Sequence, residues 1–270
     1  MTDLDPTSKI RLNNGVPMPV LGLGTWGMTG EKCYRAVRTA LDMGYRLIDT
    51  ASLYRNEEEV GRAVRDSGVS REEVFITTKV ASWEQGYDGT MAAFKGSLKR
   101  LGLDHIDLYL VHWPVAGRSA DTWRAMEALL SEGRCRAIGV SNYSIELLKD
   151  LAKGATTPPA VNQIEFNPFV FDRELVRYCK ENKILVEAYS PLTRGNCLQE
   201  KTLLEIAHGY GRSPAQILLR WSLQRGAAVI PKASTVDHLK ENFSVFDFEL
   251  YDGDMDKLDE LDTTSCLIDH

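Results

Sequence analysis

The chain lacks the features that mark secreted, membrane-spanning and nucleic-acid-binding proteins. Its 270 residues carry a net charge of −6, and this acidic balance argues against a general affinity for nucleic acid. No apolar run approaches the length of a transmembrane helix. Residues 1–9 are mostly polar and contain no apolar segment of the kind that a secretory signal needs. We therefore expect a cytoplasmic protein with neither a nucleic-acid nor a membrane partner.

Cysteine is scarce and irregularly spaced. The five cysteines are odd in number, and no two of them form a C-x-x-C pair. Disulfide-rich domains and zinc sites are built from paired or regularly spaced cysteines. We therefore expect reduced thiols, no disulfide framework and no metal site. The cysteines are Cys33, Cys135, Cys179, Cys197 and Cys266.

Short apolar runs recur along the whole chain, and most are followed by a helical pattern. Continuous Val/Ile/Leu runs are typical of parallel strands that are covered on both faces. Eight such alternations predict an α/β fold, a (β/α)8 TIM barrel, formed as a single domain by residues 1–270. A β-hairpin with its turn at Asn14-Gly15 precedes the barrel, and a monomer is the default expectation. The runs are residues 20–23, 46–49, 74–79, 106–112, 136–141, 160–165, 185–190 and 228–232.

Helix-start signals lie between these runs. Asn56 is placed to cap the helix that runs through Arg65, with Glu59 completing a capping box. Ser213 and Pro214 begin another helix, because a capping residue followed by proline is typical of a first helical turn. The other expected helices are residues 31–43, 120–132, 144–152, 172–182 and 234–243.

The segment G22-L-G-T-W-G27 matches the glycine motif of dinucleotide-binding Rossmann folds. Asp49 follows about twenty residues later, where that fold places its ribose-binding acid. However, residues 28–30 separate the motif from the first good helix position, and Trp26 brings a large ring where backbone should approach pyrophosphate. The eight alternations favour the barrel. In a barrel, the glycines are expected to allow a tight turn at a strand end.

Polar side chains end three consecutive strand-like runs. Asp49 ends the second run, Lys79 the third and His112 the fourth, and Tyr54 lies in the loop after the second. Adjacent barrel strands would bring all four to the carboxyl ends, which form the active face of such barrels. Any one of them alone is more often structural, as an ion pair or an ordinary hydrogen-bonded side chain. The four together predict a catalytic site.

The chemistry of this group favours proton transfer to a carbonyl oxygen. A phenol has a pKa of about 10, and a neighbouring ammonium lowers it. Lys79 would lower the pKa of Tyr54, Asp49 would hold Lys79, and His112 would hydrogen-bond the same carbonyl oxygen. The alternative is a Schiff-base lyase or aldolase with Lys79 as nucleophile. That reaction needs a lysine with a lowered pKa, and Asp49 would act in the opposite direction.

The last strand suggests an anion site. Lys232 and a helix start follow it, at the place where barrels commonly bind phosphate. Tyr189 offers a flat ring that could stack on a heterocycle, and Gln163 and Asn142 could hydrogen-bond an amide. A nicotinamide cofactor would use all of these groups. An ordinary exposed helix cap is the alternative interpretation of the Lys232 segment.

The sequence resembles the aldo-keto reductase family over nearly its whole length, and is similar to the short bacterial-type diketogluconate and methylglyoxal reductases. The motifs that carry the resemblance are G22-L-G-T-W, L47-I-D-T-A-S-L-Y-R-N-E, F75-I-T-T-K, L110-V-H-W-P, G139-V-S-N-Y, V161-N-Q-I-E-F-N-P, E187-A-Y-S-P-L and V229-I-P-K-A-S.

The resemblance implies a barrel enzyme that transfers hydride from NADP(H) to a small-molecule carbonyl substrate. It implies Tyr54 as proton donor, with Asp49, Lys79 and His112 completing a catalytic tetrad. The implied cofactor-binding residues are Gly24, Thr25, Trp26, Asp49, Ser141, Asn142, Gln163, Tyr189, Ser190, Pro191, Leu192, Lys232, Ser234, Thr235, His238, Glu241 and Asn242. The implied substrate-binding residues are Trp26, Trp83, His112 and Trp113.

Two positions depart from the family pattern, and both lie near the expected 2′-phosphate. Ala233 stands where a serine is usual, and His238 stands where an arginine is common. Arginine carries a permanent charge, whereas histidine is mostly neutral at pH 7, so NAD(H) is an alternative cofactor. Residues 114–120 form a short loop, which predicts an open and permissive substrate pocket. A non-catalytic NADP(H)-binding redox sensor is the alternative function.

Overall fold

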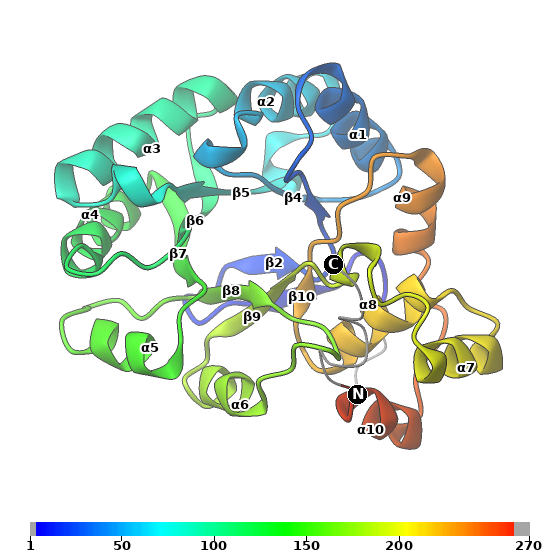
Figure 1. Cartoon of the computed structure of the whole chain (residues 1–270). Helices are drawn as coiled ribbons and strands as arrows, with labels where there is room; N and C mark the ends of the chain where they lie inside the picture. Colours follow the sequence, from blue (N-terminus) through cyan, green and yellow to red (C-terminus); the bar gives the residue numbers. More distant parts are fainter. Residues whose placement is uncertain (1–3, 262–270) are drawn as a thin grey trace.

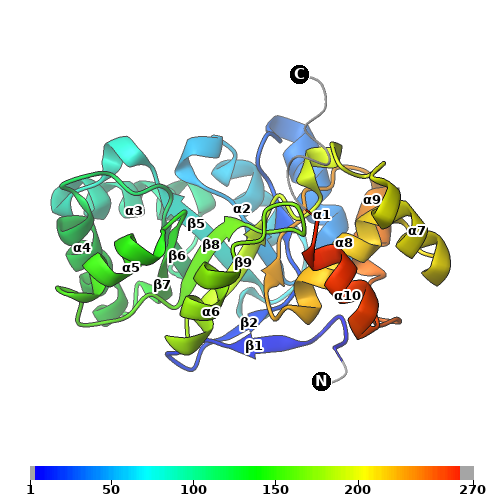
Figure 2. The ribbon, with the colours of Figure 1, turned by 60° about the horizontal axis from the view of Figure 1, so that its bottom comes forward.

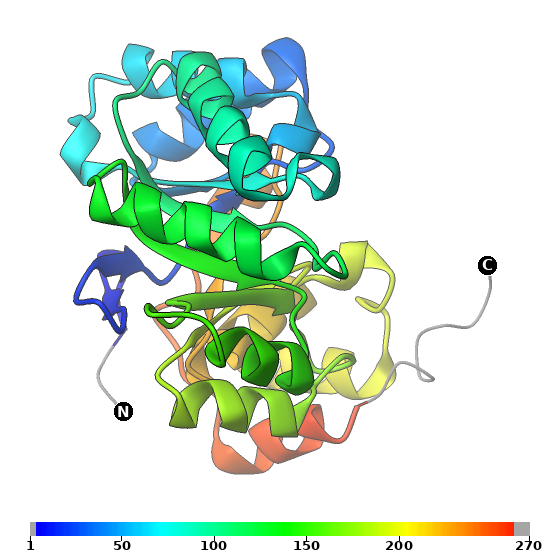
Figure 3. The ribbon, with the colours of Figure 1, turned by 90° about the vertical axis from the view of Figure 1, so that its left-hand side faces the viewer.

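The computed structural model describes residues 4–261 and begins with the expected hairpin. Strands β1 (Lys9–Arg11) and β2 (Pro17–Pro19) pair antiparallel. The Leu12 N–H donates to Val16 O at 2.9 Å, and Gly15 has φ 87°, a left-handed conformation that suits glycine in a tight turn. Figure 3 shows that this hairpin covers one end of the molecule.

Eight parallel strands form the predicted (β/α)8 barrel. The sheet runs in sequence order from β3 to β10, and a bridge between Leu21 and Val229 joins its two edges. The Gly22 N–H donates to Val229 O at 2.8 Å across the same junction. This closure excludes the open Rossmann sheet. The strands, seen end-on in Figure 1, are β3 (Leu23–Gly24), β4 (Leu47–Asp49), β5 (Phe75–Val80), β6 (Ile106–Val111), β7 (Cys135–Ser141), β8 (Val161–Glu165), β9 (Leu185–Tyr189) and β10 (Ala228–Val229).

Gly22 and Gly24 make the barrel closure possible. A Cβ on Gly24 would lie 2.6 Å from the backbone oxygen of Ile230, and one on Gly22 would lie 2.4 Å from the Leu47 side chain. A larger residue at Gly24 would push the first and last strands apart, and one at Gly22 would displace the Leu47 side chain on β4. The predicted turn role is therefore wrong for these two glycines and correct for Gly27, which has φ 69°.

Helices surround the barrel (Figure 1). All of the predicted helices are present, and α3, α7 and α10 were not predicted. The predicted start of α8 at Ser213 and Pro214 is confirmed, and a capping box forms there, because the Gln216 N–H donates to Ser213 Oγ and the Ser213 N–H donates to Gln216 Oε1. The helices are α1 (Gly30–Asp42), α2 (Glu57–Asp66), α3 (Tyr87–Leu101), α4 (Ser119–Ser131), α5 (Ile145–Ala152), α6 (Arg173–Glu181), α7 (Lys201–Tyr210), α8 (Pro214–Gln224), α9 (Val236–Phe243) and α10 (Asp252–Asp259).

The buried apolar residues form two clusters. The larger one includes residues of the helices, such as Val37 on α1 and Trp221 on α8, and the smaller one includes Leu47 and Leu108 on strands and Met18 of the hairpin. Figure 2 shows the hairpin lying beneath the strands, where Met18 can close the smaller cluster. Within residues 4–261, no helix is long and apolar enough to cross a membrane.

The cysteines partly follow the prediction. Cys33, Cys135 and Cys179 are buried free thiols, and burial raises the pKa of the Cys33 and Cys135 thiols to about 12. Cys197 is disulfide-bonded, so the prediction of reduced cysteines is wrong at this residue. Cys266 lies outside the described residues.

Asn56 stands at the N-cap position of α2, but its side chain makes no capping hydrogen bond, so the predicted capping box is wrong. The buried side chain instead donates to Thr25 O at 3.0 Å and to Met28 O at 2.8 Å. Its Oδ1 accepts from the Thr50 hydroxyl at 2.6 Å. Asn56 therefore joins the loop after β3 to the loop after β4, and both loops border the barrel mouth.

We expect Asn56→Ala to lower the free energy of unfolding by about 3–4 kcal/mol, because it leaves several buried polar groups without partners. Chemical denaturation measures this loss. The matched control is Ser144→Ala at the start of α5, where the side chain does cap, accepting from the Leu147 N–H. That change should cost only about 1 kcal/mol. Equal decreases in the free energy of unfolding in both variants would mean that Asn56 contributes no more than an ordinary helix cap.

Candidate active site

A buried ion pair lies at the carboxyl ends of β4 and β5. Both side chains are almost fully buried, and Lys79 Nζ lies 2.7 Å from each carboxylate oxygen of Asp49. It also donates to Thr50 O at 3.0 Å. The strands are adjacent and parallel, with Asp49 opposite Thr77 in register, so Lys79 extends two residues further toward the barrel mouth. The predicted pairing of these two side chains is therefore confirmed.

Tyr54 lies beside this pair. It ends the short 3-10 helix Ser52–Tyr54 in the loop after β4. Lys79 Nζ lies 3.4 Å from its hydroxyl oxygen and 4.9 Å from its ring centroid. The His112 ring follows β6 and meets the Tyr54 ring edge-on, with 5.5 Å between centroids. The four residues expected to meet at the carboxyl ends thus do so.

The charge state of Lys79 follows from its surroundings. Burial opposes a charge there and is the largest single effect, but Asp49, Tyr54 and Glu187 together outweigh it, and the pKa of Lys79 is raised above its ordinary value. A raised pKa keeps the amine protonated and removes its nucleophilicity at neutral pH. The Schiff-base alternative, which requires a lowered pKa, is therefore disfavoured.

The pKa of Tyr54 is also raised, and burial is the main cause. Lys79 acts to lower it, as predicted, but desolvation and the charge of Asp49 outweigh that effect. The prediction of a lowered pKa is thus wrong for the chain by itself. Tyr54 is a neutral phenol at physiological pH, and the adjacent ammonium is placed to stabilise a phenolate once the proton leaves.

His112 is an uncharged imidazole at neutral pH. Burial and the neighbouring Lys79 charge lower the pKa of His112 to about 3. Its Nδ1 atom is buried and makes no hydrogen bond with any residue that the structure describes. Its backbone oxygen accepts from Asn142 Nδ2 at 3.2 Å. A neutral ring orients a polar ligand by hydrogen bonding without adding a charge to the site.

Polar side chains at the ends of β7, β8 and β9 form a connected network. The Tyr189 hydroxyl donates to Asn142 Oδ1 at 2.8 Å, and Asn142 Nδ2 donates to Ser141 Oγ at 3.0 Å. The Ser141 hydroxyl donates to Gln163 O at 2.8 Å. The network holds the side chains of Ser141 and Asn142 and the predicted stacking ring of Tyr189 in fixed positions.

Glu187 belongs to the site and was missed by sequence reasoning. It is fully buried on β9, and Gln163 Nε2 donates both to Glu187 Oε2 at 2.7 Å and to Asp49 Oδ2 at 2.9 Å. Burial and then the charge of Asp49 raise the pKa of Glu187 to about 8. Its other oxygen, Oε1, has no partner within the described residues. The available signal was a carboxylate inside the apolar run L185-V-E-A-Y.

Strained backbone gathers at this end of the barrel. Among the described residues, six that are not glycine have positive φ, and five of them lie in loops that follow β4, β7 or β9. Left-handed conformations cost a residue with a side chain about 1–2 kcal/mol, and such strain concentrates at functional sites. The five are Arg55, Asn142, Ser190, Thr193 and Arg194.

The predicted anion-binding residues surround the start of α9. Lys232 is exposed, and its Nζ lies 5.8 Å from the centroid of the Trp26 ring, as does the Arg194 guanidinium carbon. Thr235 caps α9 by accepting from the His238 N–H at 3.3 Å. Asn242 is buried, whereas His238 is exposed. Ser234 precedes α9, Glu241 lies in the last turn of α9, and Pro191 and Leu192 lie in the loop after β9. Their cofactor contacts stay predictions.

The three tryptophans predicted to bind substrate all follow carboxyl strand ends. Trp26, Trp83 and Trp113 are exposed by 57%, 66% and 48%. Large exposed rings around a polar site are a common feature of ligand pockets. Within residues 4–261, no group of three or more potential ligands could hold a metal ion.

Comparison with known proteins identifies the class. Residues 20–263 match the model of the Aldo/keto reductase family. The chain is 48% identical over 260 residues to glyoxal reductase of Bacillus subtilis, covering 95% of this chain and 94% of that protein. An aldo/keto reductase from Brucella melitensis has a TM-score of 0.92 at 44% identity, covering 95% of this chain and 100% of that one. The silkworm aldo-keto reductase AKR2E5, solved with NADPH, has a TM-score of 0.89 at 38% identity, covering 96% and 89%.

The fold and the polar site at its mouth are thus those of an oxidoreductase barrel. The chain belongs to the aldo/keto reductase family.

Glu187 predicts a pH dependence of stability. Its pKa is raised from 4.5 to about 8 in the folded chain, so its contribution to stability falls as pH rises through that interval. His112 acts oppositely, but only below its ordinary value of 6.5. Between pH 6.5 and 8 the free energy of unfolding should therefore decrease by about 2 kcal/mol.

Denaturant titrations at several pH values measure this decrease, and Glu187→Gln should remove most of it. If the free energy of unfolding of the wild type and of Glu187→Gln changed with pH in parallel between pH 6.5 and 8, Glu187 would be ionised in the folded protein.

Proposed function

We propose that the protein reduces aldehyde and ketone carbonyls with NADPH, and that Tyr54 donates the proton to the carbonyl oxygen. The observation that carries this proposal is the position of Lys79, whose Nζ lies 3.4 Å from the Tyr54 hydroxyl oxygen and 2.7 Å from both Asp49 oxygens. The phenol is neutral before transfer, and the fixed ammonium stabilises the negative charge that develops on it. His112 then orients the carbonyl oxygen by a hydrogen bond.

The residues around the barrel mouth fit a nicotinamide cofactor. Both hydrogens of Gln163 Nε2 are used by Asp49 and Glu187, which leaves Gln163 Oε1 to accept a hydrogen bond from a carboxamide N–H. Ser141 and Asn142 supply further polar atoms, and Tyr189 supplies a ring for stacking. NADPH, when bound, supplies the hydride. Structures of related proteins with NADPH or NADP support this assignment.

Cofactor choice depends on the α9 end of the site. Lys232 is an exposed basic residue beside the helix start, which favours a 2′-phosphate, but His238 replaces the usual arginine. We therefore propose that NADPH is preferred with a reduced margin and that NADH also supports turnover.

His238→Arg should increase the ratio of kcat/KM for NADPH to that for NADH by about 5- to 20-fold, since it adds a bidentate charge near the phosphate. Steady-state kinetics with each cofactor measure the ratio. Lys240→Arg, about half a turn further along the same helix, is the control and should leave the ratio of kcat/KM values unchanged. An unchanged ratio in His238→Arg would place this position away from the cofactor.

The substrates proposed are small dicarbonyls, keto-sugar acids and aromatic aldehydes. The similarity to a glyoxal reductase supports the first of these. Only residues 112–118 separate β6 from α4, and the three tryptophans are left exposed. An open rim of this kind suits several carbonyl compounds of different shape.

Tyr54→Phe should lower kcat for methylglyoxal by at least about 1000-fold, because it removes the proton donor and retains the ring. The affinity for NADPH, measured by fluorescence titration, should change less than about threefold. Tyr178→Phe, a tyrosine on α6 remote from the tetrad, is the control and should keep full activity. If no carbonyl in a panel is reduced by the wild-type chain while NADPH still binds, the redox-sensor alternative replaces the enzyme.

A further inference from the structure

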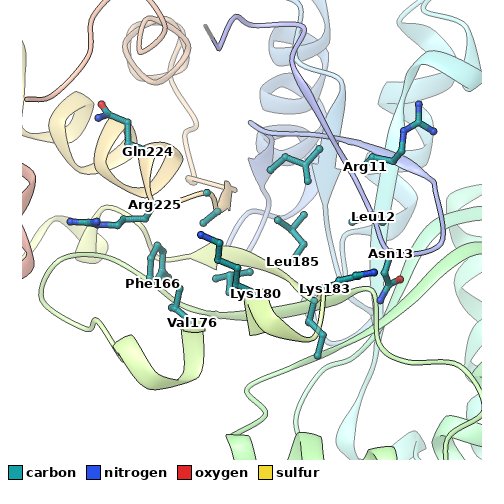
Figure 4. A pocket seen from close by; sticks show the side chains of 15 residues that line it. Arg11, Leu12, Asn13, Phe166, Val176, Lys180, Lys183, Leu185, Gln224 and Arg225 are labelled. Carbon is teal, nitrogen blue, oxygen red and sulfur yellow. The ribbon is translucent and has the colours of Figure 1, made fainter. Parts of the chain in front are cut away.

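A cavity outside the tetrad lies beside β9, between the hairpin, α6 and the end of α8. It has a volume of about 570 Å³, within the range of about 300–1,000 Å³ that is typical of ligand pockets. Its walls come from the hairpin, the end of α6, the start of β9 and the segment after α8 (Figure 4). Leu185 is the first residue of β9 and Tyr189 the last. Leu185 and Tyr189 are about 13 Å apart along the strand, and the cavity extends from Leu185 to Phe166, which follows the carboxyl end of β8.

The cavity combines an apolar lining with a cationic rim. Its apolar side chains include Leu12, Phe166 and Leu185, and four lining residues are cationic: Arg11, Lys180, Lys183 and Arg225. None of the described residues that line it is acidic. The chain as a whole carries a net charge of −6, so this local excess of positive charge runs against the general composition.

Most of these cations are not neutralised by the protein. Arg225 is paired with Asp259, with Nη2 2.6 Å from Oδ2. Lys180 and Lys183 form no ion pair within residues 4–261, and Arg11 donates only to the backbone oxygen of Gly15 at 3.0 Å. Lys180 in the last turn of α6 also stabilises the helix dipole. That role explains neither the position of Lys183 nor the cavity.

Lys183 has a strained backbone. Its φ is 57°, and it is the sixth non-glycine residue with positive φ among the described residues. The other five lie in loops of the candidate active site. The conformation closes α6 in a Schellman motif, because the Lys183 N–H donates to Lys180 O at 3.1 Å and the Ile184 N–H donates to Cys179 O at 2.8 Å. Glycine or asparagine usually occupies this position, so Asn can replace Lys183 without loss of the helix end.

The cavity walls are fixed by hydrogen bonds. Asn13 Nδ2 donates to Pro159 O at 2.9 Å and attaches the hairpin turn to the barrel. Gln224 is doubly bonded to Leu250, donating to its oxygen at 2.9 Å and accepting from its N–H at 2.8 Å. The site is therefore largely formed before any ligand arrives, which lowers the entropic cost of binding.

We propose that this cavity binds a small amphipathic carboxylate, with its apolar body against Leu12, Phe166 and Leu185 and its carboxylate at Lys180 and Lys183. The apolar lining excludes a fully hydrated anion such as phosphate as the best ligand. The absence of lining acids favours an anion over a neutral amphiphile. This assignment is independent of the carbonyl-reducing site.

Sodium decanoate is the probe, and isothermal titration calorimetry of the full chain is the measurement. We expect one saturable site that NADP+ does not displace. Lys183→Asn removes one charge, so it should weaken decanoate binding several-fold. Asparagine suits the left-handed conformation, so the free energy of unfolding should stay the same or increase. Lys180→Gln combined with Lys183→Asn should raise Kd at least about tenfold.

Lys99→Gln is the matched control, because it removes an exposed lysine on α3 that does not line the cavity, and its Kd should equal that of the wild type. Decanol, which is uncharged, and inorganic phosphate, which has no apolar body, should each bind at least about tenfold more weakly than decanoate.

Three results would overturn the proposal. Unchanged decanoate affinity in the double lysine variant would show that Lys180 and Lys183 do not bind the carboxylate. Equal affinity of the wild type for decanol would show that the ligand needs no charge. Binding that is lost in Trp113→Ala but kept in the double variant would place decanoate at the barrel mouth. Because every measurement is of binding, failure of the carbonyl-reductase assignment would leave these outcomes unaffected.

Discussion

The buried contact between Lys79 and Asp49 constrains the rest of the barrel mouth. Removing two charges from water costs several kcal/mol for each ion, and only close geometry with further hydrogen bonds compensates for it. Here both carboxylate oxygens lie 2.7 Å from the ammonium, Thr50 O accepts a further N–H, and Gln163 donates to the carboxylate. These contacts require β4, β5 and β8 to end at matching heights. The closed barrel supplies that alignment.

Burial and one ion pair together determine the protonation of the neighbouring groups. Burial, and then the charge of Asp49, keep Glu187 protonated near neutral pH. Burial, and then the charge of Lys79, keep His112 neutral. Tyr54 is left as the group that both contacts the ammonium and is partly accessible. The proposed role of Tyr54 as proton donor therefore rests on its contact with Lys79 and on the neutral state of its phenol.

Sequence reasoning predicted what depends on pattern and order. Apolar alternation gave the barrel, and the strand-end positions of Asp49, Lys79 and His112 placed them together before any coordinates were considered. It failed where the outcome depends on contacts distant in sequence. Asn56 matches a capping motif, but Thr25 and Met28, which it binds, are far from it in the chain.

The missed elements have the same kind of cause. The helix α3 contains Gly89 and Gly96, which weaken its local helical signal, yet Gly89 packs against the backbone of Glu84 so closely that a Cβ would lie 2.5 Å from its oxygen. The pKa of Tyr54 was predicted to fall because the sequence identified the nearby lysine. Burial, the larger effect, could be seen only in the folded chain.

The two ends of the barrel differ in what their residues contribute to the structure. At the carboxyl ends, long-range hydrogen bonds hold strained residues such as Asn142 and Ser190, and their geometry is fixed by the strands below. At the amino ends, the hairpin completes the buried core through Met18 and Leu12. The left-handed backbone of Lys183 at this end is explained by the helix end of α6, which it closes through hydrogen bonds to Lys180 and from Ile184 to Cys179. Its charge has no such explanation, because Lys183 forms no ion pair within residues 4–261 and lines an apolar cavity without acidic lining residues, and an anionic ligand would balance it.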